Sequence, residues 1–141
     1  MAATQPEAVL ASASVFLKKA MRRALLEKIA PSPLENGKTA LVGFCSPEDV
    51  PEHILRMNAC TFFSDRYEKA SPLCVSRLGC RYNLMAEEEE FDSVVCRLDA
   101  SCRTKDFAME ECARVLKPHG RLIVMKGDRR DAAEHFTKVP A

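Results

Sequence analysis

The chain contains 141 residues, of which 47% are hydrophobic and 29% are charged. This length and composition are typical of one globular domain and exclude a disordered, fibrous or membrane-spanning protein. Lysine and arginine total 21 and aspartate and glutamate total 20, so the net charge is +1. No global electrostatic field would therefore attract nucleic acid or anionic lipid, and any such binding would have to be local.

Residues 5–30 contain no glycine and predict an amphipathic helix, whose apolar face consists of Leu10, Leu17, Met21 and Leu25. The other face is basic, because residues 1–26 hold four lysines and arginines and one acidic residue. Three interpretations stay open: a cap packed on the domain, a mitochondrial targeting segment, or a surface that binds nucleic acid or a protein partner. Because the pattern of a secretory signal is lacking, we expect a cytoplasmic protein, or a mitochondrial one if this helix is a targeting segment.

Seven cysteines are spread through the chain. Their closest spacings, Cys74 to Cys80 and Cys96 to Cys102, lack the intervals of about two to four residues typical of zinc or iron–sulfur ligands, so we expect no metal site. Cys96 and Cys112 are expected to be buried, unreactive packing residues, because they lie on a predicted core strand and on the apolar stripe of the helix that follows it.

The middle of the chain predicts a strand, a helix and a second strand. Residues 39–44 form a short, apolar and partly β-branched run, and Ser46 is placed to cap a helix over residues 47–57. A second strand is expected over residues 59–64, and Asp65 follows it directly.

Residues 66–90 are the least regular part of the chain. They predict a short strand near residues 73–75 and, at residues 87–90, a solvated acidic loop or helix end.

The last third of the chain has the clearest pattern. Residues 91–98 form a β-branched apolar run, residues 104–116 predict a helix, and a proline and a glycine end that helix before a strand over residues 122–125. The apolar stripe of the helix consists of Phe107, Cys112, Val115 and Leu116. Alternating strands and helices predict a three-layer α/β fold with a mainly parallel sheet over residues 38–127.

Two segments resemble the later half of class I methyltransferases: FDSVVCRLDASC, and ARVLKPHGRLIVMKGD after the intervening helix. Members of this family commonly read Phe-Asp-x-Val, a helix, and then Arg-x-Leu-Lys-Pro-Gly-Gly-x-Leu. The matching stretch covers residues 91–127, and His119 stands where the first glycine of the turn is usual. The resemblance implies a Rossmann-like methyltransferase fold.

That family binds S-adenosylmethionine through a glycine-rich loop after the first strand and a carboxylate at the end of the second. The resemblance implies Gly43 and Asp65, 22 residues apart, as the cofactor-binding residues. Gly43 is the only glycine of its loop, Phe44 is bulky and Pro47 has no amide hydrogen, so the loop is poorly suited to the cofactor. No serine or cysteine nucleophile pairs with an orienting histidine, so no catalytic residue is predicted.

Class I methyltransferases continue for two further strands beyond the one that matches residues 122–125. Residues 128–141 instead predict one short helix and no antiparallel hairpin. We therefore expect a truncated sheet within a single domain over residues 1–141, with an exposed edge. The N-terminal helix or a protein partner would cover that edge.

A small, glycine-poor domain of this kind resembles the N-terminal domain of the anamorsin family of cytosolic iron–sulfur cluster assembly factors. The matching motifs are Lys38–Val42, Phe91–Val95 and Ala113–Pro118. The resemblance implies a non-catalytic domain that acts through protein contacts and holds neither cofactor nor metal, since family members carry their cluster cysteines in a separate C-terminal segment. The alternative is an S-adenosylmethionine-dependent methyltransferase of unknown substrate.

Overall fold

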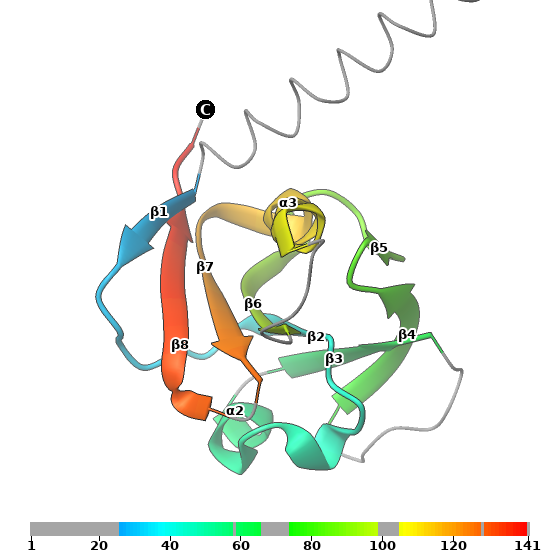
Figure 1. The fold of residues 1–141 in the computed structure, drawn as a ribbon. Coiled ribbons are helices and arrows are strands. Elements are labelled where there is room, and N and C mark those ends of the chain that lie inside the picture. Colours follow the sequence, from blue (N-terminus) through cyan, green and yellow to red (C-terminus); the bar gives the residue numbers. More distant parts are fainter. Residues whose placement is uncertain (1–25, 58, 66–73, 99–104, 128, 141) are drawn as a thin grey trace, which may run out of the picture.

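The structure, a computed structural model, describes residues 26–57, 59–65, 74–98, 105–127 and 129–140. It shows one sheet of eight strands in the order β1-β8-β7-β6-β2-β3-β4-β5 (Figure 1). Most of the helix predicted over residues 5–30 lies outside the described residues.

Five parallel strands form the centre of the sheet. They are β4 (Cys74–Cys80), β3 (Ala59–Ser64), β2 (Lys38–Val42), β6 (Phe91–Leu98) and β7 (Leu116–Lys126). Strands joined by antiparallel pairing flank them: β5 (Asn83–Leu84) pairs with β4 on one side, and on the other side β8 (Arg129–Lys138) pairs with β7 and β1 (Leu26–Ile29) pairs with β8. The sheet is therefore mixed, with the predicted parallel order confined to its centre.

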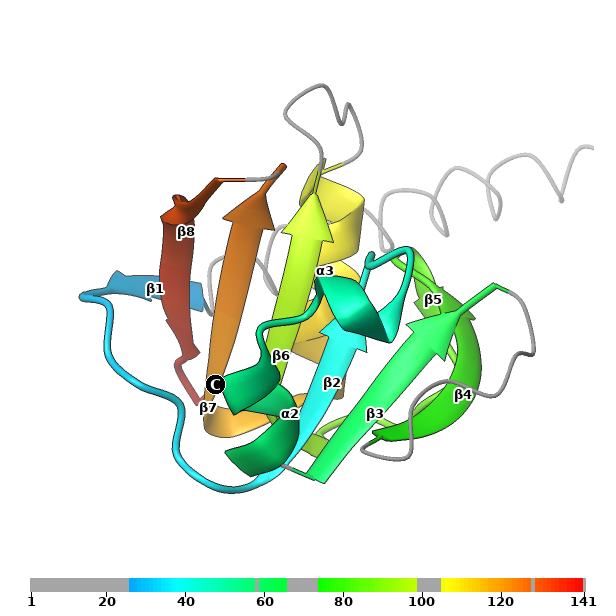
Figure 2. The ribbon, with the colours of Figure 1, turned by 90° about the horizontal axis from the view of Figure 1, so that it is seen from below.

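Helices cover both faces of the sheet, which confirms the three layers (Figure 2). The short 3₁₀ helix η1 (Pro47–Asp49) and α2 (Glu52–Met57) lie on one face, and α3 (Lys105–Val115) lies on the other. The predicted helix over residues 47–57 is thus divided at Val50 and Pro51, and Ser46 caps its first part as expected. No helix among the described residues is long and apolar enough to cross a membrane.

The face of α3 that packs on the sheet consists of Ala108, Met109, Cys112 and Val115. Cys112 and Cys96 are both buried in this cluster, which confirms their predicted burial. Phe107 is 48% exposed, so its predicted place on the apolar stripe is wrong. It lies five residues before Cys112, which is about 140° around the helix and away from the sheet.

The expected truncation after residues 122–125 is wrong, because the sheet continues beyond them. β7 and β8 form an antiparallel hairpin in which Lys126 pairs with Arg129. Gly127 makes the turn possible, since its φ of +58° is in the left-handed region that favours glycine. Residues 129–138 are therefore a strand rather than part of a short helix.

The end of the predicted N-terminal helix is also wrong, because Leu26–Ile29 is a strand that forms the outer edge of the sheet. Leu26 pairs with Lys138 and Ile29 pairs with His135, both in antiparallel register. Since β8 is itself antiparallel to β7, β1 runs in the direction of the central strands. β8 and β1 thus supply the two further strands that we expected the chain to lack.

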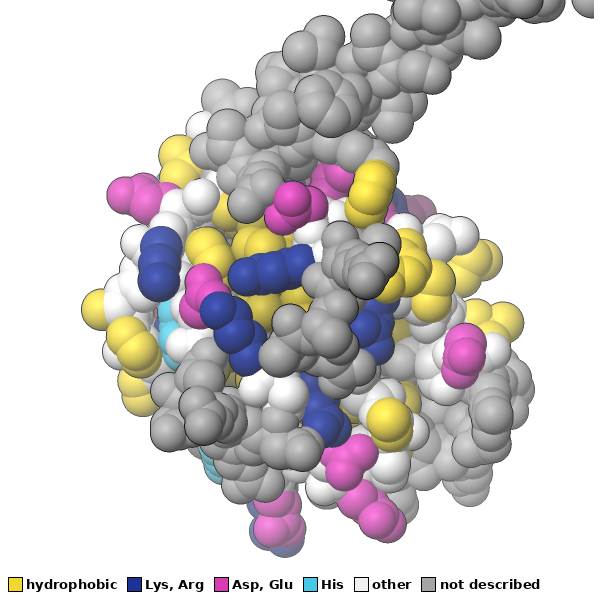
Figure 3. Space-filling view, viewed as in Figure 1, with side chains coloured by type: hydrophobic (Ala, Val, Ile, Leu, Met, Phe, Trp, Pro, Cys, Tyr) yellow, Lys and Arg dark blue, Asp and Glu magenta, His cyan; other side chains and the backbone are white. Residues whose placement is uncertain are grey.

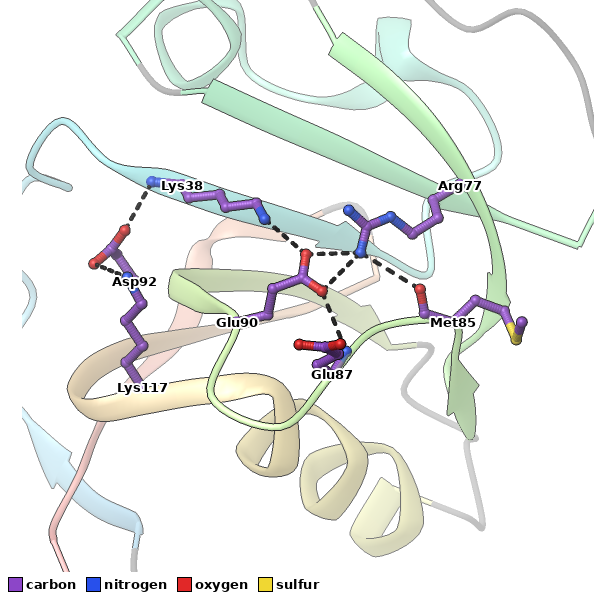
Figure 4. A network of polar contacts seen from close by, with 7 residues as sticks. All are labelled: Lys38, Arg77, Met85, Glu87, Glu90, Asp92 and Lys117. Atoms are coloured by element: carbon purple, nitrogen blue, oxygen red, sulfur yellow. Dashed lines mark hydrogen bonds and ion pairs between the residues drawn. The ribbon is translucent and has the colours of Figure 1, made fainter.

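A polar network around Glu90, which directly precedes β6, joins β2 and β4 to the loop after β5 (Figure 4). The Glu90 carboxylate accepts hydrogen bonds from Lys38 Nζ at 2.7 Å, from Arg77 Nη1 at 2.7 and 2.9 Å, and from the Glu87 amide at 3.2 Å. Its side chain is 16% exposed, so the prediction of a solvated acidic segment is wrong for this residue. The loop after β5 is therefore tied to β2 and β4 by charge-assisted hydrogen bonds.

Candidate functional site at the carboxyl edge of the sheet

The carboxyl ends of the central parallel strands lie together and face the viewer in Figure 1. Gly43 directly follows β2 and Asp65 directly follows β3. These strands are neighbours, with Leu41 paired to Phe62, so both residues lie at the same edge of the sheet. In open α/β sheets this edge is where ligands bind. That Gly43 and Asp65 bind a cofactor stays a prediction.

Packing alone explains why residue 43 is glycine. Its φ is +81°, and a Cβ atom at this position would lie 2.3 Å from the Arg97 carbonyl oxygen of β6. Such a contact is far shorter than van der Waals separation, so any side chain would force β2 and β6 apart. The glycine is thus required by the sheet, whether or not a ligand approaches it.

Three backbone amides in the second half of the loop after β2 already donate within the loop. Glu48 N donates to Ser46 Oγ at 3.2 Å, Asp49 N to the Ser46 carbonyl at 3.1 Å, and Val50 N to the Pro47 carbonyl at 3.1 Å. Pro47 itself has no N–H. Positions 47–50 therefore offer no amide for the carboxylate or phosphate cradle that such a loop builds in dinucleotide-binding proteins.

Phe44 does not obstruct this edge of the sheet. Its side chain is 6% exposed and belongs to the apolar cluster between the sheet and α2, with Val50 and Ile54. The bulky residue that the sequence places in the loop thus anchors the loop to the core.

Arg97 is a polar residue of this edge that the sequence analysis missed. It lies near the end of β6, and its side chain is 21% exposed. Nε donates to the Gly127 carbonyl at 3.2 Å, and Nη1 lies 3.9 Å from Asp49 Oδ2. Arg97 therefore connects the loop after β2 with the end of β7. A lone arginine in the apolar run FDSVVCRL was the signal available in the sequence.

Basic side chains gather over the middle of this face (Figure 3). Lys126 forms an ion pair with Glu134, and Lys105 and Lys28 lie 3.7 and 3.9 Å from the same carboxylate. The hydrogen bond from Lys126, opposed by burial and helped by the three charges, lowers the pKa of Glu134. Three cations around one carboxylate make this part of the edge locally basic, although the net charge of the chain is near zero.

Among the described residues, no group of three histidine, cysteine, aspartate or glutamate side chains is arranged to hold a metal ion. Cys60, Cys96 and Cys112 are buried, whereas Cys45 and Cys80 are exposed. Asp65 is exposed at the strand end. Its carboxylate is accessible, which is one requirement for a hydrogen bond to a ribose.

No family model and no curated protein matches the sequence. Solved structures do match the fold. A candidate methyltransferase from Bacillus halodurans aligns with a TM-score of 0.53 and 16% identity, covering 66% of this chain and 46% of its own. A candidate S-adenosyl-L-methionine-dependent methyltransferase from Methanococcus maripaludis gives a TM-score of 0.52 and 15% identity, covering 67% and 49%.

A third match is a chain from the complex between the Haloferax volcanii Trm112 methyltransferase activator and its candidate methyltransferase. The TM-score is 0.52 and the identity is 17%, covering 65% of this chain and 46% of that one. The chain has a methyltransferase-like α/β fold. This methyltransferase-like domain spans about half the length of the structures that it matches. At these identities the likeness concerns the fold alone, and a shared fold does not determine activity.

Proposed function

We propose that this methyltransferase-like domain is non-catalytic and acts through contact with another protein. The observation that carries the proposal is the loop after β2. Its residues 47–50 have no amide to offer, because Pro47 lacks one and the next three amides are bonded within the loop. A cofactor that carries a carboxylate would have to break these hydrogen bonds before the amides of residues 48–50 could bind it, at a cost of roughly 1 kcal/mol each.

The packing of Gly43 and Phe44 is compatible with the same proposal. Gly43 has a positive φ and leaves no room for a Cβ atom beside the Arg97 carbonyl, and the Phe44 side chain packs in the core. Both residues thus have packing roles that need no ligand.

Within this proposal, the domain is the N-terminal part of an anamorsin-like cytosolic iron–sulfur cluster assembly factor. The support is the three matching motifs, of which Lys38–Val42 and Phe91–Val95 form the adjacent central strands β2 and β6. The partner would then be another protein of cluster assembly.

The second candidate function is an S-adenosylmethionine-dependent methyltransferase. It is favoured by the exposed Asp65, which lies at the end of β3 beside the end of β2, where the resemblance implies a ribose-binding carboxylate. The cofactor would supply the transferred methyl group. The two functions differ in whether this edge of the sheet binds the cofactor.

Isothermal titration of the full chain with S-adenosylmethionine, and separately with S-adenosylhomocysteine, tests the proposal. We expect no binding heat with either compound. Micromolar binding that is lost in Asp65→Ala but kept in Glu35→Ala, an exposed acidic residue of the segment between β1 and β2, would refute it and favour the second candidate. Binding by the wild-type chain that is lost in both variants would also contradict the expectation of no binding heat, but would not assign the site to Asp65.

A further inference from the structure

Two cysteines face each other across the neighbouring parallel strands β3 and β4. The register pairs Cys60 with Cys74 at the beginning of the ladder. Adjacent strands lie about 4.8 Å apart, and a disulfide joins Cα atoms separated by roughly 4.4–6.8 Å. The backbone therefore holds the two residues within disulfide range.

Both side chains lie on the same face of the sheet. Cys60 belongs to the apolar cluster beneath α2, and Cys74 packs against that cluster. Cys60 Sγ also donates to the Ile54 carbonyl of α2 at 3.5 Å. The two sulfur atoms are thus directed into one shared environment rather than to opposite faces.

The two thiols differ in their access to solvent. Cys60 is 3% exposed, whereas Cys74 is half-buried at the start of β4. Burial, and then the charge of Cys74, raise the pKa of the Cys60 thiol to about 11. Cys60 therefore stays protonated, and Cys74 is the thiol that meets a dissolved oxidant first.

We propose that Cys60 and Cys74 form an oxidative modification site, at which a peroxide links β3 to β4 through a reversible disulfide. The Cys74 thiolate attacks one oxygen of hydrogen peroxide, which breaks the O–O bond, gives a sulfenic acid and releases hydroxide. The Cys60 sulfur then attacks the Cys74 sulfur, loses its proton and displaces the sulfenic acid oxygen as a second hydroxide. Hydroxide takes up the displaced protons, so two thiols and one peroxide give one disulfide and two waters.

The geometry also indicates why this disulfide would be easily reduced. Residues directly opposite each other on parallel strands have Cβ atoms about as far apart as the strands, whereas a disulfide prefers a Cβ separation of roughly 3.5–4.5 Å. Closing the bond strains the pair, and strained disulfides have more oxidising potentials. Reduced glutathione should therefore restore both thiols.

The test uses the full, reduced chain treated with hydrogen peroxide, digested with trypsin without reductant and mapped by mass spectrometry. Trypsin cleavage after Arg66 and Lys69 separates the two cysteines, so a disulfide appears as two linked peptides. We expect this linked pair in the wild-type chain, with a mass about 2 Da below that of the two thiol peptides, and its disappearance after treatment with reduced glutathione.

Two serine variants form the matched comparison. Cys74→Ser should abolish the linked pair, whereas Cys80→Ser, which removes an exposed thiol at the other end of β4, should leave it unchanged. The buried Cys96 and Cys112 should remain thiols throughout. Peroxide treatment that leaves both Cys60 and Cys74 unlinked in the wild-type chain, whether as thiols, as sulfinic or sulfonic acids, or in disulfides with other cysteines, would overturn the proposal.

Discussion

Replacing Glu90 by glutamine should destabilise the domain, because this carboxylate is the centre of the network in Figure 4. Its two oxygens accept four hydrogen bonds, three of them from the cations Lys38 and Arg77. The same cations lie over the Phe91 ring, at 5.0 and 5.8 Å from its centroid. Glutamine preserves the size of the side chain but leaves both cations, which are partly buried, without an anionic partner.

The magnitude follows from the pKa of Glu90. Burial raises this pKa, but hydrogen bonds from Lys38, Arg77 and the Glu87 amide outweigh burial and lower it from 4.5 to about 2. A lowered pKa in the folded state means stabilisation that is fully present above the unfolded value near 4.5 and is lost as the pH falls through about 2. A shift of this size corresponds to about 3 kcal/mol at neutral pH.

Urea unfolding followed by circular dichroism at several pH values measures this difference. We expect Glu90→Gln to lower the free energy of unfolding by about 2–3 kcal/mol at pH 7, and this loss to shrink steadily between about pH 5 and pH 2. Using the difference between the two proteins removes the contribution of other carboxylates, such as Asp92, whose pKa is also lowered, chiefly by a hydrogen bond from the Lys38 amide.

The matched control is Glu52→Gln, which makes the same chemical change in an exposed ion pair. Glu52 lies 2.6 Å from Arg56, and both side chains are more than two-thirds exposed. Such pairs contribute roughly 0–1 kcal/mol. If Glu90→Gln costs no more than this control, or if its effect does not change with pH, the network does not stabilise the loop as argued.

Three further substitutions test the backbone conformation. Gly43→Ala should destabilise the domain by at least about 2 kcal/mol, because the new Cβ atom would meet the Arg97 carbonyl. Gly127→Ala should cost only about 1 kcal/mol, since nothing lies within 4 Å of its Cβ position. Equal losses of stability in thermal unfolding would contradict this difference. His119→Gly should stabilise the domain by up to about 1 kcal/mol, because His119 is exposed and has a φ of +66°; a lower melting temperature would show that its side chain has a packing role.

The central strands β2, β3 and β6 could be predicted from the sequence because they are largely buried on both faces. The half-exposed β4 was predicted only as a short strand near residues 73–75. Residues 39–44, 59–64 and 91–98 are short, largely apolar runs, and a strand covered on both sides is apolar along most of its length. The burial of Cys96 and the position of Asp65 at a strand end followed from the same pattern. The placement of Gly43 and Asp65 at one edge then followed from parallel order alone.

The outer strands could not be predicted in this way, because their local patterns favour other structures. β1 reads LEKI, in which leucine, glutamate and lysine are all good helix formers, and only pairing with β8 makes it a strand. The first residues of β8 are mostly charged and do not favour a strand. The dipeptide Gly127-Asp128 before them is a two-residue hairpin signal and could have indicated the turn. Tertiary pairing decided both elements.

The position of β1 depends on contacts between residues that are far apart in the chain. β1 lies at one edge of the sheet and β2 near its centre, so residues 30–37 must cross the ends of the intervening strands (Figure 2). Arg121 of β7 holds this crossing segment, donating from Nη1 to the Pro33 carbonyl at 2.7 Å and from Nη2 to the Ser32 carbonyl at 2.9 Å. Both contacts join residues almost 90 positions apart, so no local pattern contains them. Pro31 and Pro33 favour an extended backbone in this segment, and the hydrogen bonds from Arg121 hold it in place. Together they allow β1, whose sequence favours a helix, to pair as the last strand of the sheet.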